Sequence, residues 1–159
     1  SFYNYYDNKE QILEALLGDF ATSVVEASLT TGHHDPYEGV TAAVTAYWKM
    51  YKEYLPEMIG LQQMALTDPG FRQRLLETRA AGIKQILVGL HRAEDLGYTV
   101  DLPLDLLASA LTSTLESNCS VWLAVGGDIG IPPPDDETAI RVLSAIWYRT
   151  VYSGPPAPA

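Results

Sequence analysis

Basic residues are scarce in this chain. Lysine and arginine together number 10 among 159 residues, against 20 aspartates and glutamates, so the formal net charge is −10. Binding to the phosphates of a nucleic acid needs clustered lysine and arginine side chains. The composition by itself therefore argues against a nucleic-acid-binding role for these residues, unless basic helices lie outside them.

Cysteine and long apolar runs are also rare, and each absence excludes a class of protein. Cys119 is the single cysteine, so an internal disulfide is impossible and a reducing, cytoplasmic location is predicted. No apolar run approaches the roughly 18 residues that a membrane-spanning helix needs. Residues 1–13 are polar and aromatic, unlike a signal peptide. We therefore expect no membrane partner.

The motifs of common enzymes are missing as well. The chain has no G-x-S-x-G, no H-E-x-x-H, no phosphate-binding loop and no G-x-G-x-x-G, and each of these marks a known catalytic or cofactor site. Adjacent His33 and His34 point in different directions and lack a spaced carboxylate or cysteine, which favours a solvated loop over a metal site. The sequence therefore predicts a protein that is not an enzyme and binds no cofactor or metal.

What the sequence does have is apolar residues at helical spacing. Hydrophobic residues make up 47% and charged residues 19%, which indicates one folded domain with a substantial core. No stretch alternates with the period of a β-strand, so an all-α fold of several helices is predicted. Capping residues, prolines and glycines divide it into helices at about 8–31, 36–53, 55–66, 67–96, 103–125 and 135–152, followed by a disordered tail at 153–159.

The last two predicted helices each have two apolar faces. Val142 and Ile146 lie on one face of the helix at 135–152, and further apolar residues lie on the other. A helix that is apolar on two faces needs two surfaces to pack against. A second copy of the chain, joined through a four-helix interface in a two-fold dimer, would supply one of them. The alternative is a fully buried central helix in a monomer.

The most specific pattern lies at the N-terminus. Phe2-Tyr3 and Tyr5-Tyr6 precede Asn8-Lys9-Glu10, and Ile12-Leu13 begin an apolar helix. This order resembles the end of the recognition helix, the following turn and the start of the fourth helix in TetR-type transcriptional regulators.

The resemblance implies a domain organisation. Residues 1–7 would be the remnant of an N-terminal helix-turn-helix DNA-binding domain whose first two helices precede Ser1, and residues 8–152 would form the effector-binding and dimerisation domain. Tyr3, Tyr5 and Lys9 would contact the operator DNA backbone, because hydroxyl and ammonium groups are suitable donors to phosphate. The alternative is that the four N-terminal aromatic residues are simply core of an all-helical protein.

A ligand cavity is the second candidate site. Several helices offer aromatic or soft side chains with a few polar ones among them, which suits a small hydrophobic effector, and TetR-type regulators bind effectors between such helices. The predicted ligand-binding residues are Val44, Tyr47, Trp48, Tyr51, Met58, Leu61, Gln62, Gly82, Ile83, Ile86, Thr112, Leu115, Asn118, Cys119, Trp122 and Trp147.

Each apolar member of this set could equally be ordinary core, and the polar members are more informative. Thr112 and Asn118 lie on or beside an apolar stripe, where a buried amide without a partner would be costly. They would bond either a ligand or a neighbouring backbone carbonyl.

Together these features predict a ligand-responsive, homodimeric regulator of the TetR type, acting as a repressor that a small hydrophobic effector releases from DNA. The helix at about 8–31 would connect the DNA-reading head to the cavity. The alternative function is a helical carrier of a hydrophobic ligand, or a dimerisation module, without DNA binding.

The predicted phosphate contacts can be tested by mutation. Because phosphates carry no sequence information, Tyr3→Phe or Lys9→Ala should weaken binding to specific and non-specific DNA alike, as measured by fluorescence anisotropy. A loss from Lys9→Ala confined to one DNA sequence would contradict the phosphate role.

Overall fold

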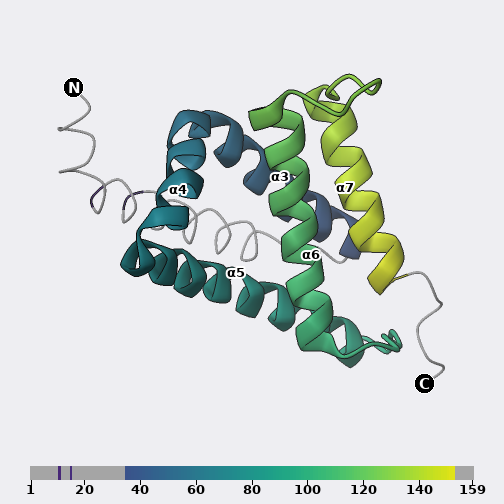
Figure 1. The fold of residues 1–159 in the computed structure, drawn as a ribbon. Helices are drawn as coiled ribbons and strands as arrows, with labels where there is room; N and C mark the ends of the chain where they lie inside the picture. Colours follow the sequence, from purple (N-terminus) through teal and green to yellow (C-terminus); the bar gives the residue numbers. More distant parts are fainter. Residues whose placement is uncertain (1–10, 12–14, 16–34, 153–159) are drawn as a thin grey trace.

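The computed structural model describes residues 35–152, together with Gln11 and Ala15, and shows an all-α domain (Figure 1). This confirms the predicted fold class. Its elements are α3 (Pro36–Glu53), α4 (Leu55–Thr67), α5 (Pro69–Asp95), α6 (Leu104–Cys119), η1 (Ser120–Val125) and α7 (Asp136–Val151). None of the helices in the described part is both long and apolar enough to cross a membrane. The predicted helix at 8–31 and the predicted tail at 153–159 fall almost wholly outside the described residues.

The helices begin where local side chains favour them. Asp35 precedes α3 and accepts a hydrogen bond from the backbone N–H of Tyr37 at 3.0 Å. Asp68 does the same for α5, and Asp135 for α7. A capping carboxylate satisfies one of the N–H groups that a helix start leaves unpaired. The observed starts therefore match the sequence prediction to within two residues.

The end of α6 differs from the prediction of one regular helix at 103–125. The α-helical pattern stops at Cys119 and a π-helical segment, η1, follows from Ser120 to Val125. Gly126 and Gly127 both have positive φ, a conformation that glycine adopts without steric cost. Their N–H groups both reach the carbonyl of Val121, at 3.1 and 2.8 Å. The wider π turn is thus closed by two glycines that follow it.

A first core lies where α3 crosses α6 and α7. Trp48 and Val44 from α3 are almost completely buried, as are Cys119 from α6 and Leu143 from α7. The indole N–H of Trp48 donates to a carboxylate oxygen of Asp136 at 2.8 Å, which satisfies the polar atom of an otherwise apolar side chain. This core holds the N-terminal half of the described fold against its C-terminal helix.

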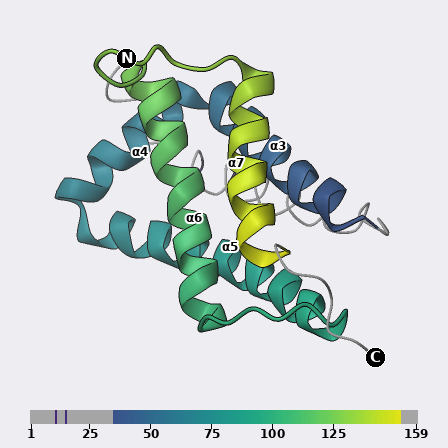
Figure 2. The same ribbon diagram turned by 90° about the vertical axis from the view of Figure 1, so that its right-hand side faces the viewer.

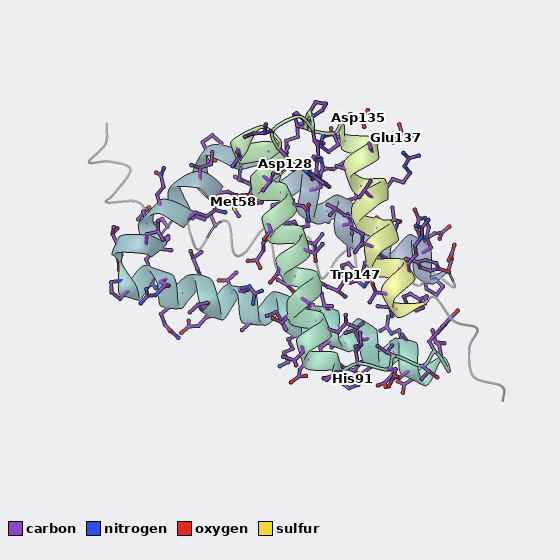
Figure 3. All side chains as sticks on the ribbon, turned by 45° about the vertical axis from the view of Figure 1, so that its right-hand side comes forward. Met58, His91, Asp128, Asp135, Glu137 and Trp147 are labelled. Carbon is purple, nitrogen blue, oxygen red and sulfur yellow. The ribbon has the colours of Figure 1, made fainter. Side chains whose placement is uncertain are left out.

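A second core joins α5 to the N-terminal half of α6. Leu90 and Ala93 from α5 pack with Leu107, Ala108 and Leu111 from α6. Trp147 on α7 packs against this core and the first one, and Figure 3 shows it beside α6. Figure 2 shows α6 and α7 side by side, with α5 crossing beneath them. α6 and α7 therefore both contribute buried side chains to the two cores, α7 through Leu143 in the first and Val151 in the second.

A stability measurement can test the first core. Leu143 is 2% exposed, so Leu143→Ala should lower the free energy of unfolding by about 2–5 kcal/mol. Leu66 is 82% exposed, and the matched change Leu66→Ala should alter it by no more than about 0.5 kcal/mol. Urea denaturation followed by circular dichroism would compare them. Equal effects of the two changes would contradict the placement of Leu143.

Candidate functional site

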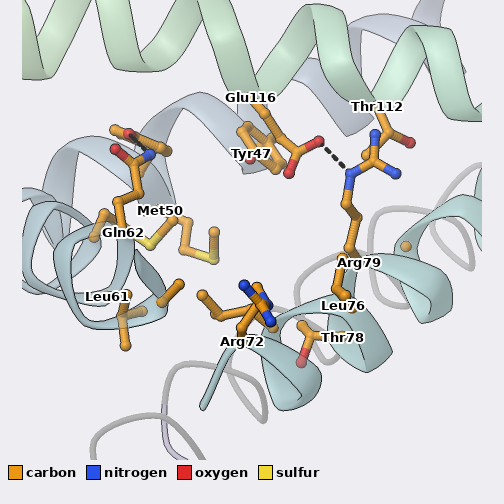
Figure 4. A pocket seen from close by; sticks show the side chains of 15 residues that line it. Tyr47, Met50, Leu61, Gln62, Arg72, Leu76, Thr78, Arg79, Thr112 and Glu116 are labelled. Carbon is orange, nitrogen blue, oxygen red and sulfur yellow. Dashed lines mark hydrogen bonds and ion pairs between the residues drawn. The ribbon is translucent and has the colours of Figure 1, made fainter. Parts of the chain in front are cut away.

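A cavity of about 300 Å³ lies between α3, α4, α5 and α6 (Figure 4). This volume is at the lower end of the range for small-molecule sites. The side chains around it come from all four helices: Tyr47, Met50, Tyr51, Met58, Leu61, Gln62, Ala65, Arg72, Leu75, Leu76, Thr78, Arg79, Gly82, Thr112 and Glu116.

Most of the cavity wall is apolar. Tyr47 and Tyr51, one helical turn apart on α3, have ring centroids 6.3 Å apart. Met50 and Met58 add flexible thioether side chains, which adapt to the shape of what they contact. Trp147 is not among the lining residues, and Figure 3 shows its label on the other side of α6 from that of Met58. Such a wall favours a ligand that is largely apolar.

An ion pair joins α5 to α6 at the edge of the cavity. Nε of Arg79 donates to a carboxylate oxygen of Glu116 at 2.7 Å (Figure 4). Nη2 of Arg79 donates to the Ser113 hydroxyl at 2.7 Å and to the Ser109 carbonyl at 3.3 Å. Hydrogen bonds from a planar guanidinium to several acceptors fix its orientation. Arg79 and Glu116 therefore compensate each other's charge while still lining the cavity.

A second arginine, Arg72, lines the cavity near the start of α5. Its guanidinium points toward the interior of the cavity in Figure 4. The ion pairs seen within the described stretch include Lys52 with Asp136 and Arg79 with Glu116. Arg72 belongs to none of them.

The two tyrosines remain neutral near pH 7. Burial, followed by electrostatic interaction with Cys119 and Glu116, raises the pKa of Tyr47 well above its usual value. Burial also raises the pKa of Tyr51, whose hydroxyl accepts a hydrogen bond from Nε2 of Gln62 at 3.1 Å. A neutral phenol can donate as well as accept. The tyrosines thus supply polar atoms to the wall without adding charge.

The structure brings only part of the predicted ligand set to this cavity. The predicted residues that line it come from all four helices, and they are Tyr47, Tyr51, Met58, Leu61, Gln62, Gly82 and Thr112. The hydroxyl of Thr112 donates to the carbonyl of Ala108 at 2.8 Å. Of the two partners expected for Thr112, a ligand or a backbone carbonyl, the structure shows the backbone carbonyl.

The other predicted residues lie elsewhere. Val44, Trp48, Leu115 and Cys119 belong to the first core, with Trp122 and Trp147 packed against it, and Ile83 and Ile86 pack against the second. Nδ2 of Asn118 donates to the Thr114 carbonyl at 2.7 Å. Its partner is thus a neighbouring backbone carbonyl, one of the two partners expected for it.

Several lining residues were missed by sequence reasoning, namely Met50, Ala65, Arg72, Leu75, Leu76, Thr78, Arg79 and Glu116. The predicted set took only apolar and neutral residues, so charged ones were left to the solvent-exposed faces. A usable signal was present, because Arg72, Leu75, Leu76, Arg79 and Gly82 recur at three- and four-residue spacing along α5 and so share one face.

The structure provides no support for the other candidate sites. The described residues contain no group of three or more histidines, cysteines, aspartates or glutamates placed to hold a metal ion. His33 and His34 lie outside the described residues, as do Tyr3, Tyr5 and Lys9. The proposed DNA contacts therefore remain sequence-based.

Comparisons with known proteins assign no family. The chain matches no protein-family model. It also matches no curated protein at a significant level.

The environment of Cys119 makes its reactivity a test of the first core. Burial raises the pKa of this thiol to about 12, and the thiolate is the reactive form. At pH 8 the native protein should therefore react with a thiol-specific reagent far more slowly than the urea-unfolded protein, as followed by absorbance. Equal rates would contradict the burial of Cys119.

The same pKa shift predicts a pH dependence of stability. In the unfolded chain the thiol loses its proton above about pH 9, whereas in the folded protein it keeps it until about pH 12. The free energy of unfolding should therefore fall as pH rises above about 9.

Proposed function

We propose that this chain is the effector-binding and dimerisation part of a ligand-responsive, TetR-type transcriptional repressor. The observation that carries the proposal is the cavity between α3, α4, α5 and α6. Its largely apolar wall with a few oriented polar groups is the usual character of a small-molecule site.

The DNA-binding part of the proposal rests on the N-terminal sequence. Tyr3, Tyr5 and Lys9 are the proposed contacts to the operator backbone, within the motif that resembles TetR-type regulators. The base-reading residues of a helix-turn-helix lie in its recognition helix, before this motif. The acidic charge of the chain is compatible with this division, because the sensing domain does not itself touch DNA.

The homodimer of the proposal is supported by exposed side chains on α6 and α7. Leu106 on α6 is 66% exposed and Ile146 on α7 is 45% exposed. Ala110 and Ser117 continue the α6 face one and three turns after Leu106, and both are exposed. Small residues permit close helix approach, and α6 and α7 lie side by side (Figure 2). Two copies of this pair would form a four-helix interface with two-fold symmetry.

The proposed mechanism is a shift between two spacings of the DNA-reading heads. An effector that fits the cavity of one conformer better stabilises that conformer. The released conformer no longer matches two half-sites on adjacent turns of the major groove. A coupling of about 1–3 kcal/mol, usual for allosteric proteins, would change DNA affinity about 5- to 150-fold.

The alternative function is a helical carrier of a hydrophobic ligand that does not bind DNA. The charge of −10 favours it, because a carrier needs the cavity but no phosphate contacts. The two functions make opposite predictions about DNA.

A binding measurement separates them. The protein expressed from its complete gene should bind its own promoter DNA, and the logarithm of the binding constant should fall with that of the salt concentration by about 0.9 per phosphate contact. A hydrophobic compound that changes the fluorescence of buried Trp48, which lies beside the cavity tyrosines, should then release the DNA. Absence of sequence-preferring binding at low salt would overturn the regulator and support the carrier.

A further inference from the structure

The charges around the cavity do not balance. Among the residues that the structure describes, three charged side chains line it, namely Arg72, Arg79 and Glu116. Nε of Arg79 lies 2.7 Å from a carboxylate oxygen of Glu116, so these two charges compensate each other. The positive charge of Arg72 remains. The whole chain carries −10, so a net positive cavity is contrary to the general composition.

The two arginines differ in their environment. Arg79 donates hydrogen bonds from Nε and Nη2 to Glu116, Ser113 and Ser109. These bonds fix the orientation of its guanidinium, and Glu116 compensates its charge. Arg72 takes part in none of the ion pairs or side-chain hydrogen bonds of the described chain, and its side chain points toward the cavity interior (Figure 4). Its guanidinium is therefore the group available to a ligand.

The rest of the wall restricts the ligand's shape. Met50, Met58, Leu61 and Leu75 line the cavity, and burying a charge against such side chains is costly unless the charge is paired. A ligand with a single anionic group can place that group on Arg72 and its apolar body against these side chains. A guanidinium binds a carboxylate with two parallel hydrogen bonds.

We propose that the cavity selects an amphipathic anion, an apolar body of modest size with one carboxylate, and that Arg72 is the residue that recognises the carboxylate. This inference rests on the proposed ligand-binding function and names the chemical class of its effector. Glu116 contributes in the opposite sense, because its carboxylate, already paired with Arg79, repels a second anion from the α6 side. The anionic group is thereby directed toward Arg72 on α5.

The experiment compares three compounds with the same chain and different head groups. Octanoate, octan-1-ol and octylammonium would each be titrated into the full-length protein at pH 7 in low salt, with affinity measured by calorimetry. Octanoate should bind about 10-fold more tightly than octanol, since a charge-assisted pair adds roughly this much. Octylammonium should bind most weakly. Half-molar salt should reduce the advantage of octanoate, because Arg72 is exposed to solvent and its charge is screened.

Variants identify the residue responsible. Arg72→Gln should lower octanoate affinity to that of octanol and leave octanol unchanged, whereas Arg72→Lys should retain part of the preference. Lys84→Gln removes the same charge from α5 at an exposed position that does not line the cavity, and it should change neither affinity. Circular dichroism would establish that all three variants are folded.

The proposal is overturned if octanol or octylammonium binds as tightly as octanoate, if Arg72→Gln leaves the preference intact, or if none of the three compounds binds. None of these outcomes depends on DNA. The regulator itself fails by a different result, absence of promoter binding, so the two failures can be told apart.

Discussion

α6 has to bury side chains in two separate cores along a single helix, and the rest of the fold is arranged around that requirement. Leu107, Ala108 and Leu111 in its first half pack with α5, while Leu115 and Cys119 in its second half pack with α3 and α7. Closely packed cores transmit a displacement of one helix to its neighbours. A shift of α6 therefore cannot leave α3, α5 and α7 all unchanged.

The cavity is lined by a face of α6 that is not filled by the two cores. Thr112 and Glu116 follow the core residues Leu111 and Leu115 by one position, which on an α-helix turns the side chain by about 100°, toward the cavity that they line with α4 and α5. There Arg79 reaches three acceptors on α6. Its side chain is 27% exposed and that of Glu116 is 38% exposed, so solvent screening limits the stabilisation to about 1 kcal/mol. The contribution of the pair is chiefly geometric, since it fixes α5 relative to α6 beside the cavity.

The sequence predicted the helices well because their boundaries are set locally. Asp35 with Pro36 and Asp68 with Pro69 are starts that cap and proline rules identify without tertiary information. The π-helical segment after Cys119 was not predicted, because the pattern of apolar residues there fits an α-helix too. It depends on the hydrogen bonds that Gly126 and Gly127 make to Val121.

The site was predicted only in part, for a different reason. Tyr47, Tyr51 and Gln62 could be predicted because aromatic side chains with a few polar groups among them suit a small, largely apolar ligand. Arg79 and Glu116 are 37 residues apart, and no local rule joins them. Cys119 and Trp48 were assigned to the cavity because an apolar helix face looks the same whether it lines a core or a ligand site. Only the packing of α7 on α3 places them in the core.

The acidic charge of the chain and the positive charge in its cavity act over different distances. In ordinary salt, exposed charges are screened beyond about 8–10 Å, so most of the −10 is felt by an approaching anion only weakly. Inside the cavity the charges that the described residues supply are those of Arg72, Arg79 and Glu116, and the last two cancel in large part. An anionic ligand would thus be bound by local contact rather than attracted from a distance. Arg72 can therefore favour an anion despite the acidic exterior, and only an anion whose apolar part also fits the wall gains from both contacts.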